Sequence, residues 1–189
     1  MFGCTIGVYI FTMTKLEFRA LIDEAQYTKL LLKLNKEAED LGACDSETYF
    51  FDLGDKLLKV SQLIKDDTAF VSLKDHTIMS SSEFIDKKVC IYKGDFDKMV
   101  EIFKDMNMSD TVSHSYQRRH NYRYNGIEIA LKYSENWEYH VEITATFRSS
   151  RQKEDEIIKV KELAKEINVK LMSEREIAEF IQKKQKDLN

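Results

Sequence analysis

The sequence contains no proline, only six glycines and three cysteines, and each scarcity argues against a class of architecture. Without proline and without glycine-rich or low-complexity stretches, no linker divides the 189 residues, which favours a single domain. Cys4, Cys44 and Cys90 are an odd number and lack CxxC or Cys/His spacing, so neither a disulfide framework nor a zinc site is expected. A reducing, cytoplasmic location fits these thiols best.

Strong positive charge and long apolar runs are also missing. The chain has 29 Lys and Arg against 33 Asp and Glu, a net charge of −4, which argues against a protein that coats polyanions with its whole surface. Any anion site must therefore be local. No apolar run approaches the roughly 18 residues of a membrane-spanning helix, so no membrane partner is expected.

The first twelve residues, MFGCTIGVYIFT, are apolar and β-prone. They lack the basic start and the small-residue cleavage pattern of a secretory signal. We interpret residues 1–12 as an N-terminal extension and residues 13–189 as a single domain.

Hydrophobic periodicity predicts a strand-rich chain with helices at intervals. Residues 26–41 carry leucines at helical spacing and precede Gly42, which is typical of a helix C-cap. Asn125-Gly126 predicts a hairpin turn, and Ser173 with Glu176 predicts a capping box for a last helix. Strands are expected at residues 15–22, 47–53, 56–64, 68–75, 77–85, 88–93, 114–124, 126–134 and 137–147, and helices at 26–41, 95–106, 153–169 and beyond 173. The fold class is α+β, with a helical C-terminus.

Several predicted strands place charged or polar residues two apart, and therefore on one face. The ordinary explanation is that this face of an antiparallel sheet meets bulk water. The alternative is a closed barrel whose lumen holds both signs of charge, as a polyphosphate and its divalent cations would require. The residues themselves leave both explanations open. The three sets are Lys15/Glu17/Arg19, Arg119/Asn121/Arg123 and Glu138/His140/Glu142.

The order of segments resembles the CYTH superfamily of triphosphate tunnel enzymes over roughly residues 15–147. The segments are KLEFRALI, a helix, ETYFFD, a basic strand pair, a second helix, RRHNY and the strand that carries Glu142. That superfamily includes class IV adenylate cyclases, thiamine triphosphatases, inorganic tripolyphosphatases and, more distantly, RNA 5′-triphosphatases. The resemblance implies an antiparallel β-barrel, the triphosphate tunnel, with flanking helices and a triphosphate ligand.

The resemblance also implies roles for individual residues. The opening Glu-x-Glu-x-Lys signature falls on Lys15, Glu17 and Arg19, and the later Arg-x-x-Tyr motif falls on Arg119 and Tyr122. By this comparison Glu17, Arg19 and Arg119 are the candidate catalytic residues. The candidate phosphate-binding residues are Lys15, Arg19, Lys59, Lys74, Arg118, Arg119 and Lys132, and the candidate ligands of Mg²⁺ or Mn²⁺ are Glu17, Glu83 and Glu142.

Four positions lack the residue type of the superfamily pattern. Lys15, Lys132 and Thr144 stand where carboxylates are usual, and Ser61 stands where a second basic residue is usual. A lysine in place of a carboxylate removes a ligand for a metal ion and adds a positive side chain. Such a site can still bind a polyanion, but it need not activate water. The inference about the fold is therefore firmer than the inference about activity.

Two function classes follow. The first is a divalent-metal-dependent phosphohydrolase acting on an organic or inorganic triphosphate. We favour it over a class IV-type cyclase because more branches of the superfamily hydrolyse their triphosphate substrate than cyclise it. The second is a catalytically impaired module that binds or senses a nucleotide, a polyphosphate or an RNA 5′-triphosphate. The sequence does not decide between an enzyme and a binder, and it leaves the oligomeric state open, a homodimer included.

Overall fold

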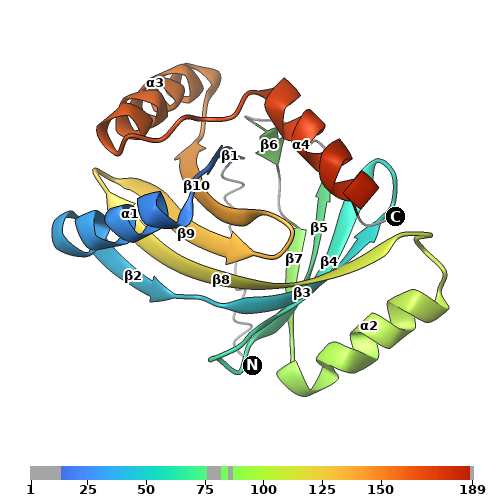
Figure 1. Cartoon of the computed structure of the whole chain (residues 1–189). Coiled ribbons are helices and arrows are strands. Elements are labelled where there is room, and N and C mark those ends of the chain that lie inside the picture. Colours follow the sequence, from blue (N-terminus) through green and yellow to red (C-terminus); the bar gives the residue numbers. More distant parts are fainter. Residues whose placement is uncertain (1–13, 76–81, 85–86, 188–189) are drawn as a thin grey trace, which may run out of the picture.

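A computed structural model describes residues 14–75, 82–84 and 87–187. Its centre is an antiparallel sheet in the order β6-β1-β10-β9-β8-β3-β4-β5-β7, with β2 paired to β8 (Figure 1). The strands are β1 (Thr14–Leu21), β2 (Glu39–Ala43), β3 (Ser46–Asp52), β4 (Lys56–Leu63), β5 (Ala69–Asp75), β6 (Ser82–Phe84), β7 (Lys87–Ile91), β8 (Val112–Tyr124), β9 (Ile127–Ser134) and β10 (Glu138–Phe147). The α-helices are α1 (Glu24–Glu37), α2 (Phe96–Asp105), α3 (Ser150–Glu166) and α4 (Glu174–Asp187), and a short 3₁₀ turn, η1 (Lys93–Asp95), precedes α2.

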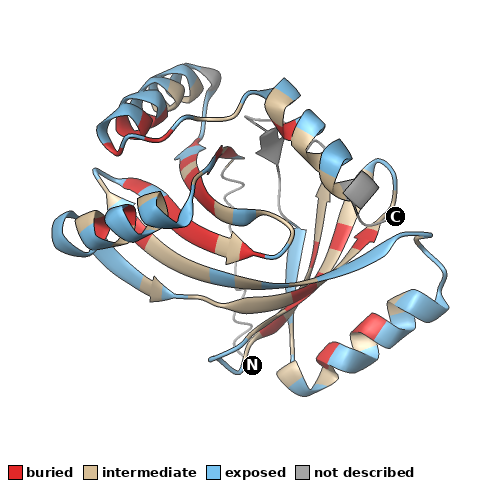
Figure 2. Cartoon of the chain, in the orientation of Figure 1, coloured by how far each residue is buried: buried red, intermediate tan, exposed pale blue. Residues whose placement is uncertain are grey.

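The sheet curls into a half-barrel, so that it has a convex and a concave face (Figure 1). Because side chains alternate along a strand, every second residue faces the same way. On β1, Leu16, Phe18 and Ala20 are buried in an apolar core on the convex face. Figure 2 shows the buried residues gathered along β1, β9 and β10, with a further group on β3 to β5.

Three helices cover the convex face. Leu30 and Leu34 of α1 and Val160 and Leu163 of α3 join the apolar residues of β1, β9 and β10 in one core cluster. A second cluster forms where Phe96 and Val100 of α2 pack against apolar side chains of β3 and β4. Burying the convex face in this way leaves the concave face as the place for a polar site.

The helix predicted over residues 26–41 is shorter than expected. Helix α1 ends at Glu37, and Ala38 is already extended, with φ −112° and ψ 160°. The segment that follows is β2, which pairs with β8 through an irregularity between Asp40 and Gly42. Gly42 has φ +90°, so it serves this β-bulge rather than a helix C-cap.

Other local predictions are confirmed. Asn125 and Gly126 both have positive φ (52° and 80°) in the turn that joins β8 to β9, as a type I′ hairpin requires. Ser173 Oγ accepts a hydrogen bond from the Glu176 amide (3.2 Å), while Glu176 Oε2 accepts one from the Ser173 amide (2.7 Å), which completes the capping box of α4. The α+β architecture and the helical C-terminal region are as predicted.

Two of the sequence predictions concern segments that the structure does not describe. The N-terminal extension, residues 1–12, and most of the strand predicted over 77–85 lie outside the described residues. The division into an extension and one domain, 13–189, stays a prediction. Within the described chain, no helix is both long and apolar enough to cross a membrane.

Candidate functional site

The three charged strand faces noted in the sequence meet on the concave face of the sheet. Arg119 on β8 lies opposite Lys132 on β9, and Lys132 lies opposite His140 on β10. Glu142 on β10 lies opposite Arg19 on β1. Lys132 and Glu142 are only 6% and 5% exposed, so at these positions the charges do not form a solvated outer surface. The barrel-lumen alternative describes them correctly.

We call the central group of this face the charged cluster. It combines five basic side chains with two carboxylates, contributed by β1, β4, β5, β8, β9 and β10. Basic residues therefore dominate the concave face of a chain whose net charge is −4. Its members are Glu17, Arg19, Lys59, Lys74, Arg119, Lys132 and Glu142.

Glu142 lies at the centre of the cluster. Its Oε1 is 2.8 Å from Lys132 Nζ and 3.5 Å from Arg119 Nη1, and its Oε2 is 3.7 Å from Arg19 Nη2. Burial raises the pKa of this carboxyl, but the three neighbouring cations hold it well below its ordinary value. Glu142 is therefore a fixed negative charge that positions the basic side chains around it.

Glu17 connects the two sides of the curled sheet. Its Oε2 is 2.9 Å from Arg19 Nη2, and its Oε1 is 3.7 Å from Lys74 Nζ on β5. Strands β1 and β5 are far apart in the strand order, so this ion pair spans the concavity. Figure 1 shows β1 and β5 on opposite sides of the half-barrel. Side chains thus link the two sides of the concave face.

Two basic groups of the cluster lack a hydrogen bond or an ion pair that an anion could supply. Arg19 Nη1 is buried and has no hydrogen-bond partner within the described part of the chain. Lys59 forms no ion pair with a described carboxylate, and its Nζ lies 5.3 Å from the centre of the Phe50 ring. Burial lowers the pKa of Lys59 to about 7, and the nearby charge of Lys74 adds to this effect. Such groups are costly unless a ligand supplies the missing negative charge.

Neighbours also set the position and protonation of the other basic groups. The Arg119 Nε donates to Asn121 Oδ1 (2.6 Å), which holds the guanidinium on the concave face. Burial lowers the pKa of Lys132 to about 8, although the adjacent Glu142 carboxylate raises it. Both groups are fixed in place before any ligand arrives.

Three residues predicted from the sequence lie apart from the charged cluster. Arg118 is on the opposite face of β8, where its guanidinium carbon lies 4.6 Å from the centre of the Tyr133 ring, so the structure does not bring it together with the other predicted phosphate ligands. Lys15 is exposed near the start of β1, opposite Thr146. Glu83 is on β6 at the register position of Leu16, and its side chain lies outside the described residues.

Sequence reasoning missed the hydroxyl groups of the concave face. Thr48, Ser61 and Ser72 are buried, and the side-chain oxygens of Thr48 and Ser61 are 2.9 Å apart. Ser61 lies two residues from Lys59, and Ser72 two residues from Lys74, so they share the face of these lysines. The two-residue spacing between these serines and the lysines could have identified them as residues of the same strand face.

One end of the concave face is covered by α4. Phe180 packs on Trp137 with ring centres 4.9 Å apart, and Lys184 Nζ lies 2.7 Å from Glu138 Oε1. Trp137 also lies 5.6 Å from the His140 ring. Burial lowers the pKa of His140 to about 4, so this imidazole is neutral at pH 7.

A divalent cation does not fit the described carboxylates of the cluster. Every carboxylate oxygen of Glu17 and Glu142 lies 2.8–3.7 Å from a Lys or Arg nitrogen. Arg19 Nη2 contacts both carboxylates, so a guanidinium bridges them. In the described part of the chain, no three His, Cys, Asp or Glu side chains gather as a metal site. The carboxylate oxygens of Glu17 and Glu142 are therefore not available to the Mg²⁺ or Mn²⁺ that the resemblance implies.

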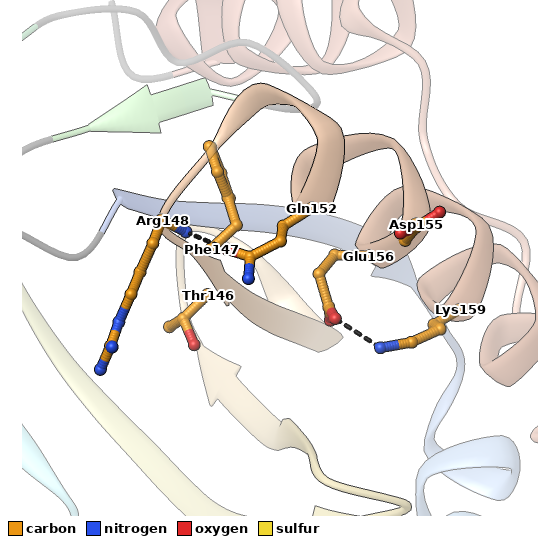
Figure 3. Close-up of a pocket in the computed structure, with 7 residues that line it drawn as sticks. All are labelled: Thr146, Phe147, Arg148, Gln152, Asp155, Glu156 and Lys159. Atoms are coloured by element: carbon orange, nitrogen blue, oxygen red, sulfur yellow. Dashed lines mark hydrogen bonds and ion pairs between the residues drawn. The ribbon is translucent and has the colours of Figure 1, made fainter.

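A second hollow lies outside the charged cluster. It is formed between the end of β10 and α3, and its lining includes Thr146, Arg148, Gln152 and Glu156 (Figure 3). Its Lys159 is paired with Glu156 at 2.6 Å, and the Arg148 amide donates to Gln152 Oε1 at 2.8 Å. Two carboxylates, Asp155 and Glu156, line this hollow, so it offers a weaker anion site than the cluster does.

Comparison with known proteins supports the fold. No protein-family model matches the chain, and no curated protein matches it by sequence. Among solved structures, a conserved hypothetical protein from Pyrococcus furiosus is 22% identical, with a TM-score of 0.67 over 82% of this chain and 91% of that one.

Two further structures carry names that refer to activity. A "putative adenylyl cyclase" from Hippeastrum, described as having a dominant triphosphatase activity, is 13% identical, with a TM-score of 0.61 over 85% of this chain and 90% of that one. A "putative adenylate cyclase" from Vibrio parahaemolyticus is 12% identical, with a TM-score of 0.61 over 88% and 98%. At these identities the likeness shows the fold alone: this chain has the curled antiparallel sheet with flanking helices of these structures, the architecture that the sequence resemblance predicted.

Proposed function

We propose that the charged cluster binds the triphosphate group of an organic or inorganic triphosphate. The observation that carries this proposal is the convergence of four basic side chains on two carboxylates, with Lys59 nearby and with Arg19 Nη1 buried and lacking a hydrogen-bond partner among the described residues. An anion would stabilise both the buried guanidinium nitrogen of Arg19 and the desolvated ammonium of Lys59, which forms no ion pair with a described carboxylate. Phosphate oxygens accept charge-assisted hydrogen bonds from both kinds of group.

The geometry suits a chain of phosphates better than a single one. Basic residues lie on both sides of the concavity, with Arg19 on β1 and Lys59 and Lys74 on β4 and β5. Arg119 and Lys132 lie between them, on β8 and β9. A linear polyanion contacts several such groups at once, whereas one phosphate reaches few of them. The buried hydroxyls of Thr48, Ser61 and Ser72 add neutral hydrogen-bonding capacity to the same face.

Metal-dependent hydrolysis of the bound triphosphate is the second candidate function. It is favoured by the Hippeastrum structure of the same fold, which is described as having a dominant triphosphatase activity. In this reading Glu17, Arg19 and Arg119 act on the transferring phosphoryl group, with the basic side chains stabilising its charge. An RNA 5′-triphosphate ligand and a cyclase reaction remain predictions from the resemblance, and the oligomeric state stays open, a homodimer included.

The test is calorimetric binding of tripolyphosphate, ATP, thiamine triphosphate and triphosphorylated RNA to the full chain, with release of phosphate followed in parallel. We expect binding of at least one ligand, weakened by about tenfold or more in Arg119→Ala because a charge-assisted hydrogen bond is lost. Arg118→Ala is the matched control, since it removes the same charge from the adjacent residue on the opposite face of β8.

Three outcomes are decisive. Binding lost in Arg119→Ala and kept in Arg118→Ala supports the charged cluster as the site. Equal weakening in both variants would show non-specific attraction and would reject it. Phosphate release that needs Mg²⁺ or Mn²⁺ and stops in Glu17→Gln would establish hydrolysis as well.

A further inference from the structure

We infer that the charged cluster binds its triphosphate without a divalent cation, because the side chains of Arg19 and Lys132 occupy the places beside its two carboxylates where a cation would bind. The inference rests on the proposed function and states which positive charges balance the triphosphate at the same site: those of Lys and Arg side chains rather than of a metal ion. It departs from the Mg²⁺ or Mn²⁺ requirement that the superfamily resemblance implies.

The first step is the position of Arg19. Its Nη2 is 2.9 Å from Glu17 Oε2 and 3.7 Å from Glu142 Oε2, so one guanidinium links the two carboxylates. A metal ion shared by these carboxylates would need the same space. The other terminal nitrogen, Nη1, is buried without a hydrogen-bond partner among the described residues, and it remains available to a phosphate oxygen.

The second step is the position of Lys132. Its Nζ lies 2.8 Å from Glu142 Oε1, and both side chains are almost completely buried. Arg119 Nη1 approaches the same oxygen to 3.5 Å. An ammonium has three donors, so Lys132 can bond Glu142 and still donate to a phosphate oxygen. This is the bridging position, between a carboxylate and a phosphate, that a divalent cation takes in metal-dependent phosphate sites.

The third step is the charge around the carboxylates. Three cationic side chains surround Glu142, and Arg19 and Lys74 lie beside Glu17. A divalent cation entering this group would be repelled by the cations and would have to displace them from their carboxylates. A triphosphate would instead be attracted by the same cations, which lie ready on rigid strands. The site is therefore preorganised for the anion alone.

The experiment is titration of the full chain with tripolyphosphate in excess chelator and again in excess MgCl₂. We expect binding in chelator at least as tight as binding in MgCl₂. Binding that appears only with MgCl₂ would overturn the inference while leaving the proposed function intact. Absence of binding under both conditions would reject the proposed function itself, so the two failures are distinguishable.

Two variants of Lys132 sharpen the test. Lys132→Glu places a second carboxylate beside Glu142, and we expect it to lose about tenfold or more of its affinity in chelator and to regain affinity with Mg²⁺ or Mn²⁺. Lys132→Met removes the ammonium without adding a donor, and we expect a similar loss that Mg²⁺ does not restore. Lys161→Glu, an identical charge change at an exposed position on α3, is the control and should bind like the wild type.

Direct metal binding gives an independent measurement if Lys132→Glu folds poorly. Electron paramagnetic resonance of free Mn²⁺ added to the wild-type chain should show no tight binding in the absence of tripolyphosphate. Tight Mn²⁺ binding by the wild type that disappears in Glu142→Gln would contradict the inference.

Discussion

Lys59 shows how a residue that opposes folding can serve a binding site. Its ammonium is partly buried on β4, pairs with no described carboxylate and has its pKa lowered to about 7 by burial and by Lys74. A core methionine of similar length would avoid this desolvation. Proteins keep such unfavourable groups mainly at functional sites, where a ligand compensates for them.

The variant Lys59→Met should therefore be more stable than the wild type and bind tripolyphosphate more weakly. Removing the desolvated ammonium is expected to stabilise the chain by about 1 kcal/mol or more, which corresponds to a rise in Tm of roughly 2–4 °C for a chain of this size. Thermal unfolding followed by circular dichroism, with tripolyphosphate titration alongside, measures both effects. Lys161→Met is the matched control, because Lys161 is exposed on α3.

The stabilisation should also depend on pH in one direction. The folded pKa of Lys59, about 7, lies below its ordinary value of 10.5, so between these values the unfolded chain binds more protons. Wild-type stability therefore rises with pH across this range relative to the variant. The advantage of Lys59→Met should be largest at pH 7 and below and should shrink as the pH increases. An advantage that grows with pH would contradict this account.

The sequence placed charged residues on common strand faces where the signal was local. A two-residue spacing of charges placed Glu17 and Arg19 on one strand face and Glu142 on another, and the structure brings them together. The pair between Glu17 and Lys74 joins strands that are far apart in the sheet order, so its formation depends on the curl of the sheet. No spacing in the sequence encodes that curl. The superfamily resemblance supplied it.

The error over residues 26–41 shows where local signals for an element mislead. Leu41 continues the leucine spacing and Gly42 follows it, as at a helix C-terminus, yet the chain becomes β2. Pairing with β8 decides the outcome: Asp40 Oδ1 lies 2.7 Å from His120 Nε2, and Glu39 Oε2 lies 3.1 Å from Arg123 Nη1. A tertiary contact of this kind overrides helix propensity, which is a weak prior.

Helix α4 allows a quantitative test of an element. Ser173 caps its first turn and exchanges hydrogen bonds with Glu176, while Phe180 attaches the helix to Trp137 beside the concave face. Ser173→Ala should cost about 1 kcal/mol, or about 2–4 °C in Tm, because the hydroxyl loses the hydrogen bond it accepts from the Glu176 amide and the one it donates to Glu176 Oε2. Ser173→Thr keeps the hydroxyl and should lose much less. Equal losses in both variants, measured by thermal unfolding, would show that the cap does not determine the stability of α4.

The distribution of charge over the whole molecule supports recognition of a compact polyanion. The chain as a whole is acidic, with a net charge of −4, while the charged cluster on the concave face has five basic side chains and two carboxylates. A long nucleic acid would meet the acidic outer surface before it reached this cluster. A short, highly charged group can enter the concavity, where hydrogen bonds to the basic side chains replace its hydrogen bonds to water.

Tripolyphosphate should stabilise the entire half-barrel, because the cluster draws on strands from both sides of the sheet. A ligand that binds only the folded chain adds about 2.7 kcal/mol at a concentration 100 times its Kd, which corresponds to a rise in Tm of roughly 5–10 °C. Phosphates also stabilise proteins by exclusion from their surfaces, so the shift must be compared with that of Arg119→Ala. Thermal unfolding at constant ionic strength measures both proteins. The wild type should show a saturating shift, and Arg119→Ala should need a higher concentration to reach it. Identical curves for the two proteins would mean that tripolyphosphate acts through the solvent and that the cluster does not join the two sides of the sheet through a ligand.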